Sequence, residues 1–225
     1  MQQVIFEDLN LIDYKKAWDY QEKLFKDVVE KKIQGDGSLH YLLFCEHPHV
    51  YTLGKSGAGS NLLISDEMLQ RINATYYEIN RGGDITYHGP GQLVIYPIFN
   101  LESFKISLKE YIHKLEQVII DFLVSYSIHA DRLDGATGVW IDSGIKGKER
   151  KICAIGVRAS RFVTMHGLAF NLNTDLNYFR YINPCGFIDK GVTSLQAETN
   201  SAIDLRTVRK SLYDLFSKEF GFLYK

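Results

Sequence analysis

The sequence predicts an α+β fold, in which a mixed and largely antiparallel sheet is flanked by helices. Three segments carry apolar side chains at helical spacing, and several short apolar runs between them are typical of strands. Strands and helices do not alternate regularly along the chain, which argues against a doubly wound parallel sheet. The chain has 225 residues, only 4 Pro and no Ser/Gly-rich spacer, so we expect residues 1–225 to form a single domain.

The helices are predicted from apolar stripes that are bounded by capping residues. The first stripe runs between an Asp suited to cap an N-terminus and a Gly suited to end a helix. The second begins with a capping box, and the third ends before another Gly. A short helical turn is expected after a serine. Asp13 and Gly35 bound the first helix, and Ser107 with Glu110 forms the capping box of the second. Gly221 ends the third helix, which starts near Leu205, and Ser65 begins the short turn.

The strands are predicted from apolar and β-branched runs that lie between turn-forming residues. The last two runs flank the polar residues 158–161, which predicts a hairpin with a polar turn. The predicted strands cover residues 39–45, 75–80, 93–99, 138–141, 152–157 and 162–171.

The composition excludes several classes of protein. Lys plus Arg is 26 and Asp plus Glu is 27, and a net charge of −1 does not suit a basic nucleic-acid coat. No apolar run approaches the roughly 18 residues of a membrane span, and the N-terminus does not read as a signal peptide. The 3 Cys do not suggest a disulfide framework. We therefore expect a cytoplasmic protein with no nucleic-acid or membrane partner.

The most unusual segment is the glycine-rich stretch of residues 81–92, between two predicted strands. Glycines allow a backbone to approach a ligand closely, so the stretch suits a ligand that takes backbone N–H bonds. The alternative is a long turn. A second cluster, residues 54–59, lacks the earlier Gly of a P-loop because His49 stands there, and we expect a flexible loop instead.

The sequence shows no clear metal site, and most of the histidines are not clear candidates for a functional site. Cys45, His47 and His49 alternate along one predicted strand, but Pro48 interrupts it and no second ligand pair has zinc-like spacing. We therefore expect no metal. His88 and His166 each precede a Gly, which makes them better candidates for a site.

Two cysteines compete as a possible nucleophile. Cys185 lies in an Asn-Pro-Cys-Gly turn, and a turn can present a thiol at a cleft. A reactive thiol also needs a nearby cation, for which Lys151 is a candidate. Lys151 and Cys153 would share one face of a regular strand, so periodicity alone leaves Cys153 as a rival.

Five sequence blocks, taken together and in order, resemble the lipoyl(octanoyl) transferases of the biotin/lipoate protein ligase-like superfamily. The glycine-rich stretch 81–92 with Tyr96-Pro97 is the strongest. The other blocks are residues 137–140, 151–157, 166–171 and 182–186. The similarity runs from about Glu46 to Leu195.

This resemblance implies a mixed sheet flanked by helices and an octanoyl transfer that passes through a cysteine thioester. It implies that Cys185 is the nucleophile, that Lys151 lowers the pKa of that thiol and shuttles protons, and that Cys153 is a packing thiol. No cofactor is implied, because thioester exchange needs no ATP. The implied acyl-substrate contacts are Arg81, Gly82, Gly83, Asp84, Ile85, Thr86, Tyr87, His88, Ala154, Ile155, Gly156, Gly167, Leu168 and Ala169.

The implied partners are an octanoyl-acyl carrier protein as donor and apo lipoyl domains as acceptors, namely those of 2-oxoacid dehydrogenase complexes and the glycine cleavage H protein. A carrier protein is acidic, so the basic residues Lys146, Lys148, Arg150 and Lys151, followed by Arg158 and Arg161, could dock it. The alternative is a solvated loop. Phe170 stands where Leu is more usual and could alter the wall of the acyl pocket.

Three other functions stay open. An ATP-dependent lipoate or biotin ligase of the same fold would depend on ATP and would not need Cys185. A catalytically silent carrier-binding module would tolerate loss of both Cys185 and Lys151. An amidotransferase would take the octanoyl group from an already octanoylated protein rather than from a carrier.

Overall fold

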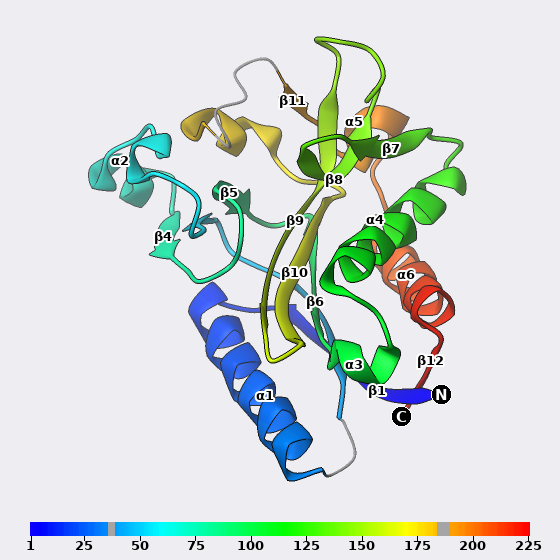
Figure 1. Ribbon diagram of the computed structural model, residues 1–225. Coiled ribbons are helices and arrows are strands. Elements are labelled where there is room, and N and C mark those ends of the chain that lie inside the picture. The colour runs from blue at the N-terminus through cyan, green and yellow to red at the C-terminus, as the bar shows by residue number, and fades with distance from the viewer. Residues whose placement is uncertain (36–38, 184–189) are drawn as a thin grey trace.

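The computed structural model describes residues 1–35, 39–183 and 190–225. Its larger sheet has the strand order β12-β1-β2-β6-β10-β9-β8-β7, and β11 pairs with β9 off this path (Figure 1). The strands of this sheet are β1 (Gln2–Leu11), β2 (Tyr41–Glu46), β6 (Gln92–Ile98), β7 (Ala130–Leu133), β8 (Ala136–Ile141), β9 (Arg150–Ser160), β10 (Val163–Asn171), β11 (Gly191–Val192) and β12 (Phe222–Tyr224).

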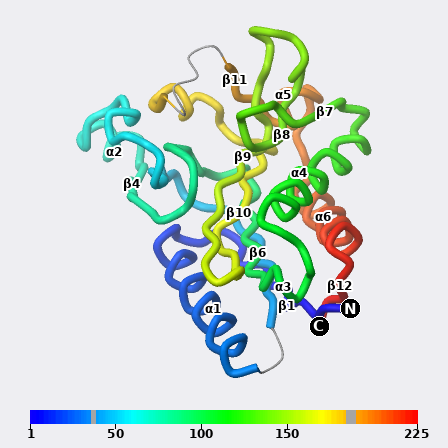
Figure 2. Tube along the Cα trace, in the orientation of Figure 1, coloured from blue at the N-terminus to red at the C-terminus, as the bar shows by residue number. Residues whose placement is uncertain are grey.

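Antiparallel pairing dominates the larger sheet, from β2 through β6, β10, β9 and β8 to β7. Parallel pairs join β1 to β2 and to β12, and β11 to β9. The predicted α+β class and the largely antiparallel sheet are therefore confirmed. The β1–β12 pair also brings the two chain ends side by side (Figure 2).

A second, small sheet has the order β4-β3-β5. Its strands are β3 (Val50–Leu53), β4 (Thr75–Glu78) and β5 (Ile85–His88). Strand β5 thus forms inside the glycine-rich stretch. The antiparallel bridge of Leu62 with Ile182 joins the segments that follow the short 3-10 turns η1 (Gly59–Asn61) and η2 (Leu176–Tyr181), and both residues pack in the apolar cluster of this sheet.

The helices cover both faces of the larger sheet (Figure 1). Helices α4 and α6 bury a large apolar cluster against one face, which includes Phe44, Ile95 and Phe170. Helix α1 packs Leu24 and Phe25 on the opposite face. The helices are α1 (Tyr14–Gln34), α2 (Asp66–Arg71), α3 (Leu101–Phe104), α4 (Leu108–Val124), α5 (Leu195–Thr199) and α6 (Leu205–Phe220). In the described ranges, none of them combines the length and apolar character needed to cross a membrane.

The predicted helix boundaries are confirmed. Each depends on a capping residue that lies close in the sequence to the backbone group it bonds. Asp13 accepts a hydrogen bond from the Lys16 amide at 3.1 Å, and Ser65 caps α2. Ser107 and Glu110 form both bonds of the capping box. The C-cap glycines, Gly35 and Gly221, have φ values of 76° and 65°, which favour glycine.

The hairpin of β9 and β10 differs in its turn from the expectation. Strand β9 continues through Ser160, so the polar turn over residues 158–161 is wrong in its bounds. Arg161 and Phe162 alone form the turn, with φ values of 52° and 62°. Two positive φ values are the signature of a two-residue turn whose twist matches the twist of the strands.

Candidate functional site

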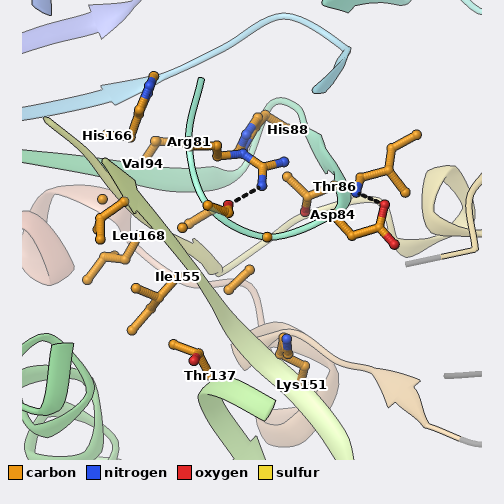
Figure 3. A pocket seen from close by; sticks show the side chains of 18 of the residues that line it. Arg81, Asp84, Thr86, His88, Val94, Thr137, Lys151, Ile155, His166 and Leu168 are labelled. Carbon is orange, nitrogen blue, oxygen red and sulfur yellow. Dashed lines mark hydrogen bonds between the residues drawn. The ribbon is translucent and has the colours of Figure 1, made fainter. Parts of the chain in front are cut away.

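A cavity of about 600 Å³ lies between the larger sheet and the loop that leads into β5. In Figure 3, Arg81, Asp84 and Thr86 lie on one side, and Val94, Ile155 and Leu168 lie across from them. Lys151 lies toward one end of this view, and His88 and His166 lie toward the other. The cavity therefore joins an apolar wall to charged and polar groups, which is the general character of small-molecule sites.

Most of the residues selected from the sequence line this cavity. They are Arg81, Gly82, Gly83, Asp84, Ile85, Thr86, His88, Lys151, Ala154, Ile155, Gly156, Gly167, Leu168 and Ala169. Tyr87 is not among the lining residues. Its hydroxyl lies 2.8 Å from His49 Nδ1, and its ring stacks on Tyr178 with centroids 4.9 Å apart. Burial raises the pKa of Tyr87, so the side chain belongs to the packing of the small sheet.

The loop before β5 is seated directly on β9. The buried Arg81 guanidinium donates from Nη2 to the Thr52 carbonyl at 2.7 Å, and the Gly82 amide donates to the Val157 carbonyl at 2.9 Å. A Cβ atom at Gly156 would lie 3.0 Å from the Gly82 oxygen. Gly156 thus allows this loop to approach the strand closely enough to bond to it.

The second glycine cluster, residues 54–59, holds the first loop from the other side. The amides of Gly54, Lys55 and Ser56 donate to the carbonyls of Asp84, Arg81 and Gly83. A Cβ at Gly54 would lie 2.3 Å from the Gly83 oxygen. The expectation of a flexible loop is wrong for residues 54–56, because three backbone hydrogen bonds fix them against the cavity wall.

Asn61 connects two segments at this wall, and the sequence reasoning missed it. Its Nδ2 lies 2.7 and 2.9 Å from the two carboxylate oxygens of Asp84. Its backbone oxygen accepts a hydrogen bond from the Asn183 amide at 2.8 Å. No local pattern marks Asn61, because its partners are distant in the sequence.

The two candidate histidines are buried and neutral. Burial is the main cause that lowers the pKa of each to about 3. Nearby His47 and Arg81 lower the pKa of His88 further, and Arg81 and Arg158 do the same for His166.

Hydrogen bonds fix the tautomer of His88. The Gln92 amide nitrogen donates to Tyr87 O and to Asn171 Oδ1, which leaves Gln92 Oε1 to accept from His88 Nδ1 at 2.7 Å. His88 therefore carries its proton on Nδ1. His166 Nε2 lies 2.8 Å from Asn80 Oδ1, and its Nδ1 is buried without a hydrogen-bond partner among the described residues.

Lys151 lies at an irregular point of β9. Val139 pairs with Cys153 and Trp140 pairs with Lys151, so two steps on β9 match one step on β8. Such a bulge interrupts the alternation of faces. Lys151 lines the cavity, whereas Cys153 is fully buried in the core shared with α4 and α6.

The expectation that Lys151 and Cys153 share one face is therefore wrong. Burial is the main cause that raises the pKa of Cys153, and it outweighs the opposite effect of Lys151. A buried thiol with a raised pKa is unsuited to nucleophilic attack. Cys45 is buried in the same way, and burial raises its pKa too.

Cys185 lies outside the described residues. The described chain before and after that segment is fixed near the cavity. Ile182 bridges to Leu62, while Lys190, Gly191 and Val192 line the cavity. Strand β11 pairs with β9 in parallel, with Val192 opposite Lys151.

The structure contradicts the expectation for Phe170, and it separates the residues of the basic stretch, whose role in docking stays a prediction. Phe170 does not line the cavity, because its ring is buried in the opposite core and packs edge-on against Phe122, with centroids 5.6 Å apart. The basic stretch is also not one surface. Arg150 forms ion pairs with Asp142 and Glu198, and Arg158 pairs with Glu22 at 2.9 Å. Lys146 and Lys148 are exposed, while Arg161 lies at the far turn of the hairpin.

The histidines considered as metal ligands in the sequence form other contacts in the structure. Within those ranges, no three His, Cys, Asp or Glu side chains come together in a way that could hold a metal ion. His47 instead contacts the Ile12 carbonyl and the Tyr96 hydroxyl, at 2.7 Å each, while His49 contacts Tyr87. The two histidines thus serve separate hydrogen-bond networks.

The sequence matches a family model and many curated relatives. A model of the lipoyl protein ligase A/B catalytic domain matches residues 13–217. An octanoyltransferase of Bacteroides fragilis is 57% identical over 208 residues, which is 92% of this chain and 94% of that protein. An octanoyltransferase of Parabacteroides distasonis is 51% identical and covers 98% of this chain and 100% of its own length.

Solved structures share the architecture at much lower identity. The bipartite lipoate protein ligase of Thermoplasma acidophilum has a TM-score of 0.74 at 15% identity, covering 100% of this chain and 86% of that chain. A lipoate-protein ligase A with bound ATP has a TM-score of 0.68 at 12% identity, covering 99% and 87%. At these identities the likeness concerns the fold alone.

Proposed function

This chain belongs to the family of the lipoyl protein ligase A/B catalytic domain, and we propose that it is an octanoyltransferase of protein lipoylation. The observation that carries the proposal is the 57% identity with an octanoyltransferase over 92% of this chain. The 600 Å³ cavity supports it, because the aliphatic side chains of Val94, Ile155 and Leu168 suit an eight-carbon chain. We further propose that residues 1–225 act as one catalytic domain in the cytoplasm.

The donor in this proposal is an octanoyl-acyl carrier protein. The acceptors are lysines of apo lipoyl domains, those of 2-oxoacid dehydrogenase complexes and of the glycine cleavage H protein. The bipartite ligase of Thermoplasma acidophilum was solved as part of a system with its E2 lipoyl domain, which supports a lipoyl domain as acceptor.

The reaction proceeds in two acyl transfers. The thiolate of Cys185 attacks the thioester carbonyl of the donor, a C–S bond forms to the enzyme, and the carrier thiolate leaves and takes up a proton. The amine of the acceptor lysine then attacks the enzyme thioester. The C–S bond to Cys185 breaks, an amide forms, and the amine gives up one proton.

Lys151 supports both steps from one end of the cavity. As an ammonium it stabilises the thiolate of Cys185 and then gives a proton to the leaving carrier thiolate. As the neutral amine that results, it takes the proton that the acceptor amine loses. Backbone amides of the glycine-flanked segments are candidates to stabilise the oxyanion. The remaining lining residues, from Arg81 to His88 and along β9 and β10, hold the acyl chain.

Intact-mass analysis tests the proposal. The protein is mixed with octanoyl carrier protein without ATP, and then with an apo lipoyl domain. We expect one octanoyl group to appear on Cys185 as a hydroxylamine-sensitive thioester and then to move to the acceptor lysine. Cys185→Ala abolishes both steps, while the matched variant Cys153→Ala retains most of the activity because that thiol lies in the core.

Three outcomes would contradict parts of this proposal. An adduct on Cys153 would overturn the choice of nucleophile. Transfer that requires ATP would identify a ligase. Transfer from octanoylated protein but not from the carrier would identify an amidotransferase.

A further inference from the structure

The side chain of Lys151 lies in a slot formed by strand β8. Its Nζ atom lies 4.7 Å from the centroid of the Trp140 ring. The aliphatic stem passes over Gly138, where a Cβ atom would lie 3.4 Å from Lys151 Cε and 3.5 Å from Cδ. A Cβ there would also lie 2.5 Å from the Cys153 carbonyl oxygen, so Gly138 allows β8 to approach β9 closely beside the stem. Trp140 provides an aromatic surface for the ammonium.

The slot is itself held by buried hydrogen bonds. Trp140 is only 2% exposed, and its Nε1 donates to the Ala136 carbonyl at 2.8 Å. The Gly138 amide donates to Glu116 Oε1 at 3.0 Å, and this glycine has a φ of 126°, a conformation that side-chain-bearing residues rarely adopt. Glu116 in turn forms an ion pair with Arg132 at 3.0 Å.

The backbone of Lys151 is fixed from both neighbouring strands. It pairs with Trp140 on β8 and with Val192 on β11. The Thr193 amide also donates to the Lys151 carbonyl at 3.0 Å. Because the Cα of Lys151 is fixed from both sides, the position of its ammonium depends on the contacts of the side chain.

We propose that Trp140 is a positioning residue, which holds the protonated Lys151 ammonium at the end of the cavity through a cation–π contact. The face of an indole ring attracts a cation but not a neutral amine, so the contact favours the charged form of Lys151. This inference rests on the proposed function. It means that Lys151 serves the nucleophile first as a fixed cation, then gives its proton to the leaving carrier thiolate, and only after that accepts a proton from the acceptor amine.

Fluorinated tryptophans test this contact with little change of shape. The chain has 2 Trp, so a Trp18→Phe background leaves Trp140 as the only site of incorporation. Each added fluorine weakens the negative face of the ring. We expect the rate of iodoacetamide alkylation of Cys185 at neutral pH to fall with each fluorine, by about 2- to 30-fold across the series. Cys45 and Cys153 are buried and give little background.

Conservative variants supply a second measurement. Trp140→Phe and Trp140→Leu both lose the hydrogen bond to Ala136 and much of the ring volume, but only phenylalanine keeps an aromatic face. We expect the phenylalanine variant to retain more alkylation rate and more octanoyl transfer than the leucine variant at equal free energy of unfolding.

The Lys151→Ala variant separates the two hypotheses. In its background, fluorination should have no effect on alkylation. If Lys151→Ala alone leaves the alkylation profile of Cys185 unchanged, the proposed pair of Cys185 and Lys151 fails. If Lys151→Ala slows alkylation but the fluorinated series is flat, or phenylalanine and leucine behave alike, only the role of Trp140 is overturned.

Discussion

The contact between the loop before β5 and strand β9 offers a way to displace this loop with little change in the free energy of unfolding. Gly156→Ala places a Cβ atom 3.0 Å from the Gly82 oxygen and 3.1 Å from Arg81 Cδ. The loop must move by a few tenths of an ångström, which strains the hydrogen bond from the Gly82 amide to the Val157 carbonyl. Losing one such bond costs about 0.5–1.5 kcal/mol.

Gly167→Ala is the matched variant inside the sheet. Its Cβ would lie 2.1 Å from the Ile95 oxygen and 2.8 Å from Pro97 Cδ. Neither neighbour is the free end of a flexible side chain, so β6 and β10 would have to separate. We expect this overpacking to lower the free energy of unfolding by about 1–3 kcal/mol or more.

The assay measures urea unfolding and transfer kinetics for both variants. Gly156→Ala should raise KM for the octanoyl donor by about 2- to 10-fold. The displaced loop must return to its position on β9 when the acyl chain binds, and this return is unfavourable. The unfolding midpoint of Gly156→Ala should change much less than that of Gly167→Ala. Equal destabilisation by both substitutions, or an unchanged KM in Gly156→Ala, would refute the view that the loop on β9 forms the acyl wall.

Three further outcomes are expected. The folded-state pKa of His88 and of His166 is about 3, below the ordinary 6.5, so each stays neutral in the fold while the unfolded chain takes up a proton. Stability should therefore be complete above pH 6.5 and fall by about 1.4 kcal/mol per pH unit per histidine as the pH drops toward 3, as measured by urea unfolding at several pH values. Asn61→Ala removes two hydrogen bonds to a carboxylate at the cavity wall, and should raise KM several-fold with a loss of stability of about 1–3 kcal/mol. Changing the exposed Lys146 and Lys148 to Glu should raise KM for an acidic carrier protein and weaken its salt dependence, but leave transfer from a small octanoyl thioester unchanged.

Each of these expectations has a contradicting result. Stability that is independent of pH between 7 and 4 would show that the buried histidines are not held neutral. Wild-type KM in Asn61→Ala would remove the link to Asp84 from the acyl wall. An unchanged salt dependence in the double Glu variant would place the carrier elsewhere, and the ion pairs of Arg150 already exclude that residue from a free basic surface.

Local chemistry in the sequence was enough to define the helices and much of the cavity wall. The caps at Asp13 and Ser107 form as predicted, because a capping bond joins residues only three positions apart. The glycine-rich stretch also shows its role in the sequence, since backbone can approach backbone only where side chains are missing. The resemblance of the five blocks to the lipoyl(octanoyl) transferases is confirmed by the family match over residues 13–217 together with octanoyltransferases that are 51% and 57% identical.

Tertiary structure alone decided which groups meet. Periodicity placed Lys151 and Cys153 on one face, but the bulge between β8 and β9 separates them, because a bulge arises from pairing with a distant strand. The same dependence on distant partners hid Asn61 and turned Phe170 away from the cavity. It also placed Trp140 under the Lys151 ammonium. A sequence specifies local geometry directly, whereas the register of neighbouring strands determines which side chains face each other across the site.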